Sequence, residues 1–189
     1  MKRLLTVLIV GWLGGAIAAS QALSAKPVNV KRHTCPAEVE PLVAVMLRDL
    51  PSYANRVMVR SRPRYPAISA LNSIITAGRP EFVPLPLAPG TASTIPAPQD
   101  ASDLRQVFLT TLERQNTAGE AIELQQFHWL FLTKTQSGWR LALMFTRTGA
   151  VSPGQLITPP RESSQGTIGQ AVQTWLRDCN AGSVRPQTN

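Results

Sequence analysis

The chain has 189 residues, a mass of 20.5 kDa and a formal net charge of +8, which comes from 19 basic and 11 acidic side chains. This length suits one domain with a sizeable core and disfavours two domains. The sequence contains no GxSxG, HExxH, P-loop or GxGxxG motif, so it indicates no recognisable class of enzyme.

The first 25 residues have the pattern of a secretory signal. Lys2 and Arg3 precede an apolar run, Leu4–Ile17, and small residues that suit a cleavage site follow it. We expect cleavage, with membrane attachment only if this segment stays uncleaved. The remaining chain carries 17 basic and 11 acidic side chains, a net charge of +6. The sequence therefore predicts a basic, exported protein.

Two cysteines, Cys35 and Cys179, lie near the two ends of the exported chain. In an oxidising compartment the expected state is one disulfide between them, which would close nearly the whole domain. No CxxC or HxxxH spacing is present, so the sequence predicts neither a metal site nor a cofactor.

The predicted organisation has four parts: a signal peptide (1–25), a flexible lead-in (26–34), a single domain (35–182) and a disordered tail (183–189). The domain begins with apolar residues at helical spacing over Pro36–Leu50, and Pro51 is expected to end this helix. Because Pro41 lies past the first turn of that helix, a kink or a later start is the alternative.

The next segment, residues 52–64, fits both helical and extended spacing. We expect a short helix that becomes extended before Pro63. This segment contains the densest group of charges in the chain, which consists of Arg56, Arg60, Arg62 and Arg64. These arginines are a candidate surface for an anionic partner, with a solvated face as the alternative.

Two strands are predicted in the middle of the chain, at Ser73–Ala77 with Gly78 as a break, and at Asp103–Arg114. Between them, Arg79–Pro98 contains six prolines. Because proline cannot donate to a sheet, we expect an edge segment and then an extended loop, most mobile over Ala88–Asp100.

The clearest pattern is a β-hairpin between Gln125 and Arg147, in which aromatic and aliphatic residues alternate with a period of two. Antiparallel partners point to the same side, so the aromatic odd positions of both strands share a face only if odd residues pair with odd ones. A three-residue loop, Gln136-Ser137-Gly138, satisfies this condition. The predicted pairs are Thr135 with Trp139, Phe131 with Leu143, Trp129 with Phe145, and His128 with Thr146.

We expect the aromatic face of this hairpin to pack against the helices. The second face then carries a candidate functional cluster of His128, Lys134 and Arg140, with His128 exposed or half-buried. Of the two histidines in the chain, His128 is the better candidate for a general base.

The last predicted helix has capping-box spacing between Thr167 and Gln170, and Gly182 offers its stop. Cys35 and Cys179 each lie within about one turn of an apolar helix face, so both helices are expected on the same side of the sheet. The predicted fold class is α+β: an antiparallel sheet of four or five strands, packed on one side by an N-terminal and a C-terminal helix.

Four stretches of the chain resemble a group of exported cyanobacterial proteins of unknown function. They are RDLPSYANRV (48–57), AGRPEFVPLPL (77–87), the hairpin QQFHWLFLTKTQSGWRLALMF (125–145) and SSQGTIGQAVQTWLRDC (163–179). The resemblance implies a periplasmic, thylakoid-lumenal or extracellular setting. It implies no reaction and supplies no functional residues.

The leading functional prediction is a non-catalytic domain that binds a protein or an anionic cell-surface polymer. The alternative is a carrier that encloses a small apolar ligand between sheet and helices. A third hypothesis is a hydrolase in which His128 activates Ser163 or Ser164, provided that the loop before the last helix folds across. No specific binding of nucleic acid is expected.

Overall fold

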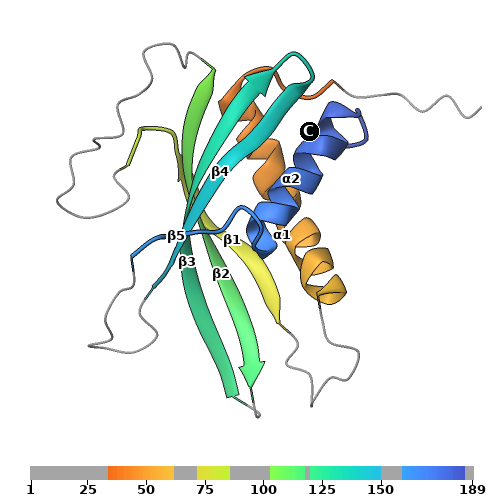
Figure 1. Ribbon diagram of the computed structural model, residues 1–189. Coiled ribbons are helices and arrows are strands. Elements are labelled where there is room, and N and C mark those ends of the chain that lie inside the picture. Colours follow the sequence, from red (N-terminus) through yellow and green to blue (C-terminus); the bar gives the residue numbers. More distant parts are fainter. Residues whose placement is uncertain (1–33, 62–71, 86–102, 118–119, 150–158, 186–189) are drawn as a thin grey trace, which may run out of the picture. The chain divides into compact units, whose positions relative to one another are not determined.

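The computed structural model describes residues 34–61, 72–85, 103–117, 120–149 and 159–185 (Figure 1). Five strands form one antiparallel sheet in the order β1-β2-β3-β4-β5. The strands are β1 (Ser73–Glu81), β2 (Leu104–Thr117), β3 (Glu120–Thr135), β4 (Gly138–Thr148) and β5 (Arg161–Glu162). Helices α1 (Val39–Arg60) and α2 (Thr167–Asn180) pack against each other and share one core with the sheet. The α+β prediction is confirmed.

Several predicted segments lie outside the described residues. They include the signal peptide, nearly all of the lead-in, the proline-rich stretch from 86 to 102, and residues 186–189. Neither described helix combines the length and apolar character that crossing a membrane requires.

Helix α1 is longer than predicted, because it continues through Pro51 to Arg60. Pro41 lies in the first turn of α1, where a backbone N–H has no helical partner. The proline ring therefore removes no helical hydrogen bond there. Pro51 does remove one helical hydrogen bond. The apolar face continues past it, however, with Ala54 and Val57 buried against the rest of the core. The predicted end at Pro51 was wrong because this burial outweighs the lost bond.

Strand β1 continues past Gly78, which was predicted to break it. Gly78 has a φ of 73°, and the pairing with β2 shifts between Ala77 and Glu81. An irregular edge strand of this kind accommodates both a positive φ and Pro80.

The turn between β3 and β4 has two residues, not three, because Thr135 pairs with Gly138. This sets Lys134 opposite Trp139 and makes the predicted register wrong beside the turn. Leu132 pairs with Leu141 and Phe131 pairs with Leu143, so Ala142 of β4 has no partner on β3. This bulge restores the predicted register further along the hairpin. The pairs confirmed there are Phe131 with Leu143, Trp129 with Phe145, and His128 with Thr146.

The prediction of which hairpin face meets the helices was wrong. The core face carries the even positions of β3, with Leu130 and Leu132 fully buried beside Met144. The aromatic odd positions lie on the opposite face and pack on one another; Phe108 of β2 meets the Trp129 ring edge-on at 5.1 Å. Both faces of β3 are apolar, so alternation alone does not tell which one the helices cover.

A disulfide joins Cys35, just before α1, to Cys179 in the last turn of α2, as predicted. It is compatible with an oxidising compartment. Gly182, with a φ of 71°, ends α2, and its N–H bonds to the Cys179 carbonyl. The predicted capping box does not form, because the N-cap is Gly166 and the Gln170 amide donates to the Gln165 carbonyl.

Candidate functional site

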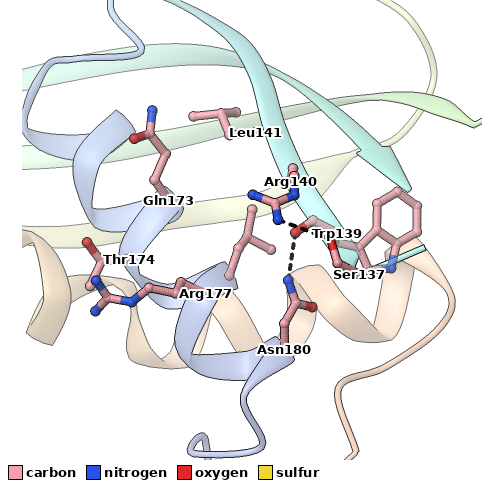
Figure 2. Close-up of a pocket in the computed structure, with 9 residues that line it drawn as sticks. Ser137, Trp139, Arg140, Leu141, Gln173, Thr174, Arg177 and Asn180 are labelled. Atoms are coloured by element: carbon pink, nitrogen blue, oxygen red, sulfur yellow. Dashed lines mark hydrogen bonds between the residues drawn. The ribbon is translucent and has the colours of Figure 1, made fainter. Parts of the chain in front are cut away.

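A groove of about 570 Å³ lies between the start of β4 and one side of α2 (Figure 2). Two arginines, four neutral hydrogen-bonding residues and three apolar residues line it: Arg140, Arg177, Ser137, Gln173, Thr174, Asn180, Trp139, Leu141 and Leu176. Because the lining that the structure describes contains cations and no carboxylate, the groove suits an acidic group.

The floor of the groove is held by bonds from three separate parts of the chain. The Asn180 amide of α2 donates to the Trp139 carbonyl of β4 at 3.0 Å (Figure 2). The Trp139 indole, which is buried, donates in turn to the Ala37 carbonyl at 3.2 Å. The disulfide at Cys35 and Cys179 ties the same two helix ends together. The groove is therefore formed before any ligand binds.

The two arginines of the groove differ in their partners. Arg177 bonds to the neighbouring carboxylate of Asp178 at 3.0 Å, so its charge is largely matched. Arg140 is exposed, and among the described residues it donates to the Ser137 hydroxyl alone, at 3.0 Å. Within the described part of the chain no acidic side chain pairs with Arg140. Arg140 therefore presents an unmatched charge at the groove.

A second hollow of about 360 Å³ adjoins the first and shares Ser137 and Asn180 with it. It lies beside Cys35, Gly138 and Gly182, and the described residues of its lining carry no charged side chain. The second hollow therefore places a neutral surface next to the cationic groove.

The arginine-rich surface predicted from the sequence does not coincide with this groove. Arg56 lies on α1, stacks over the Tyr53 ring at 4.1 Å and donates to the Ser52 carbonyl. Arg60 is exposed in the last turn of the same helix, and neither Arg56 nor Arg60 is part of the groove lining. Arg62 and Arg64 lie outside the described residues.

The predicted cluster of His128, Lys134 and Arg140 is not brought together. Lys134 is exposed and lies over the Trp139 ring at 5.8 Å, while Arg140 reaches over the groove. His128 is 0% exposed. Its predicted exposure was wrong because the even positions of β3 face the helices.

His128 belongs to a buried chain of hydroxyl groups. Its Nε2 bonds to Thr111 Oγ1 and its Nδ1 to Thr146 Oγ1, both at 2.8 Å, and Thr146 Oγ1 bonds to Ser163 Oγ at 2.7 Å. Burial lowers the pKa of His128 to about 3, from an ordinary value of 6.5. The ring is therefore neutral, with one nitrogen donating and the other accepting.

The loop before α2 does fold across, as the hydrolase hypothesis requires. The Ser163 N–H donates to the Met144 carbonyl, and the Ser164 hydroxyl accepts the Met144 N–H. Ser163 nevertheless contacts Thr146 and not His128, whose two nitrogens are both occupied. A nucleophile bonded directly to its base is absent from this cluster, and the hydrolase stays a prediction.

The apolar-carrier hypothesis also stays a prediction. Wholly buried side chains, among them Leu42, Met46, Leu132 and Trp175, occupy much of the region between the sheet and the two helices. A hollow of about 230 Å³ lies between the sheet and the start of α2, beside His128 and Ile168. As for metals, the described ranges hold no group of three or more His, Cys, Asp or Glu side chains placed to bind an ion.

On the aromatic face, Arg147 lies over Phe127 and Trp129, at 5.2 and 5.7 Å from the ring centres. The Nε atoms of Arg147 and Trp129 are buried there without a hydrogen-bond partner. Trp129 itself is only 4% exposed, so its ring is not open to an aromatic ligand.

Sequence reasoning missed the α2 side of the groove. Gln173, Arg177 and Asn180 are spaced four and three residues apart, which places them on one helical face. That spacing was visible in the sequence. The sequence does not show, however, that this helical face lies beside Arg140 on β4.

Comparison with known proteins gives no match: no family model, no curated protein and no solved structure matches the chain. The geometry of the described residues is therefore the basis for a function.

Proposed function

We propose that this protein is an exported, non-catalytic binding domain that holds an acidic partner in the groove between β4 and α2. The observation that carries the proposal is the charge of Arg140, which no described acidic side chain pairs, at a groove whose described lining has no carboxylate. Gln173, Thr174 and Asn180 provide neutral hydrogen bonds from α2 to orient an acidic group.

Export rests on the signal-like first 25 residues and on the resemblance to exported cyanobacterial proteins. The disulfide is compatible with that setting. The net charge of +6 on the remaining chain favours encounter with acidic surfaces in general. The partner is then a protein or a cell-surface polymer of the envelope.

The proposal is tested with two acidic probes, a glutamate-rich peptide and an oligogalacturonate, titrated calorimetrically at low and at physiological salt. We expect at least one probe to bind, and more weakly at the higher salt. Arg140→Gln removes a charge-assisted hydrogen bond and should weaken binding by about tenfold or more.

The matched control is Arg114→Gln, which removes the same charge from an exposed position on β2, away from the groove lining. It should change the affinity less than twofold. If neither probe binds, or if both substitutions weaken binding equally, the groove is not the binding site.

A further inference from the structure

The groove lies along an edge of the sheet that no other described strand covers for most of its length. β5 has two residues and pairs only with Phe145 and Thr146. Among the described residues, the stretch of β4 from Gly138 to Met144 therefore pairs with a strand on one side only, the side of β3. An exposed strand edge of this kind can pair with an extended peptide.

The bonds at the two ends of this edge show which main-chain groups point outward. The Trp139 carbonyl accepts from Asn180, and the main chain of Met144 bonds to Ser163 and Ser164. Main-chain groups alternate in direction along a strand, so those of Leu141 point to the same side as those of Trp139. The N–H and C=O of Leu141 are thus directed into the groove, between two ends that are already occupied.

Side chains alternate in the same way. By the pairing of β4 with β3, Trp139 and Leu141 belong to the core side of the sheet and Arg140 to the other side, while α2 forms the opposite wall of the groove. A strand added beside β4 would set one side chain next to Arg140 and the following one next to Leu141 and α2. This geometry selects an acidic residue at the first position and an apolar residue at the second.

We propose that the partner is an extended acidic peptide segment that adds as a short strand to the free edge of β4, beside Arg140. This inference rests on the function proposed above and names the class of its partner. The bulge at Ala142 ends regular pairing, so the added strand meets the stretch from Gly138 to Leu141. At the end of the edge beside the turn, Asn180 already occupies the Trp139 carbonyl. A peptide that extends past this point would pass over the neutral hollow.

The test uses an alternating glutamate–valine peptide of about six residues, which is long enough to span the free edge. A matched peptide carries N-methyl groups on the alternate residues whose N–H groups would face β4; it has the same charge but lacks the main-chain donors along that edge. We expect N-methylation to weaken binding at least tenfold, because main-chain hydrogen bonds provide much of the affinity in strand addition. Amide hydrogen exchange at Leu141 should slow at least tenfold when the unmodified peptide binds.

The outcomes separate this inference from the proposed function. If the oligogalacturonate binds in an Arg140-dependent way while the peptide does not, the groove is an anion site and strand addition is wrong. Equal binding of the two peptides, or unchanged exchange at Leu141, also overturns strand addition while leaving the acidic partner in place. If neither the peptide nor the oligogalacturonate binds, both proposals fail.

Discussion

His128 lies in the middle of the core face of the sheet and stays uncharged because burial lowers its pKa to about 3. Its two ring nitrogens are satisfied by Thr111 and Thr146, so the neutral ring adds no unpaired polar group to the core. A proton on this ring would place a charge where no acidic partner bonds to it. Within the described structure His128 is thus a satisfied core histidine.

This arrangement predicts a pH dependence of stability. The unfolded chain binds a proton at His128 below pH 6.5, while the folded chain resists it down to about pH 3. The free energy of unfolding should therefore be level above pH 6.5 and fall below it by about 1.4 kcal/mol per pH unit. Urea denaturation at several pH values between 7.5 and 4 measures this slope.

His128→Gln is the control, because glutamine can still bond to the two threonines but does not titrate. The variant is expected to have a lower stability at pH 7.5 and a flatter slope between pH 6.5 and 4. Asp49, whose carboxylate bonds to Arg48 and Trp175, has a lowered pKa and should affect stability only in more acidic solution. An equal slope in both proteins would show that His128 is not the titrating group.

At the scale of single elements, the hairpin of β3 and β4 shows how a turn and a bulge act together. The two-residue turn and the extra residue at Ala142 each shift the pairing by one, and together they restore the register that the sequence pattern predicted. Between them, the local shift sets Arg140 beside the groove. The turn also positions Gly138 against the side chain of Asn180, which lies in both hollows.

Gly138→Ala tests this contact. Gly138 has a φ of 105°, and an added Cβ would overlap the Asn180 side chain. The variant should lose about 1–2 kcal/mol from the backbone conformation, and a further amount of about 1 kcal/mol if the bond from Asn180 to Trp139 breaks. The measurement is the free energy of unfolding from urea denaturation.

Gly78→Ala is the matched control, since Gly78 also has a positive φ, of 73°, but has open space around it. Only the backbone cost applies there. The difference between the two variants therefore reports the Asn180 contact, and Gly138→Ala alone should weaken binding in the groove. Equal losses in both variants would mean that Asn180 moves aside without cost.

At the scale of the whole molecule, one disulfide links two residues that are 144 positions apart. It joins the start of α1 to the last turn of α2. Constraining so long a loop reduces the conformational freedom of the unfolded chain. The same link lies beside the groove, because Cys35 lines the neutral hollow. Stability and the shape of the binding site are therefore connected through this bond.

Replacing both cysteines by alanine should lower the free energy of unfolding by about 4–5 kcal/mol. Denaturation of the double variant, and of the wild-type protein with and without reductant, measures the loss. Thiol titration of the unfolded, unreduced protein should detect no free thiol. Two free thiols, or an unchanged denaturation midpoint, would contradict the proposed contribution of the disulfide.

Local patterns were sufficient for a large part of this fold. Period-two alternation predicted the hairpin, and helical spacing predicted the last helix. The positions of Cys35 and Cys179 predicted the disulfide and the placement of both helices on the same side of the sheet. These features were predictable because they depend on neighbours in sequence or on one specific bond. The helix end predicted at Pro51, by contrast, was too early. Residues beyond Pro51 stay helical because they are buried in the tertiary structure, which local sequence does not show.

The sequence by itself determined the two helices, the hairpin and the disulfide, since these follow from residue spacing, though not the ends of α1 and β1 or the length of the hairpin turn. Only the tertiary structure decided which face of β3 became the core, and with it the burial of His128. It also decided that Arg140 on β4 meets Gln173, Arg177 and Asn180 on α2. Both outcomes depend on which surfaces pack together over long sequence separations, and an alternation that is apolar on both faces carries no information about that choice.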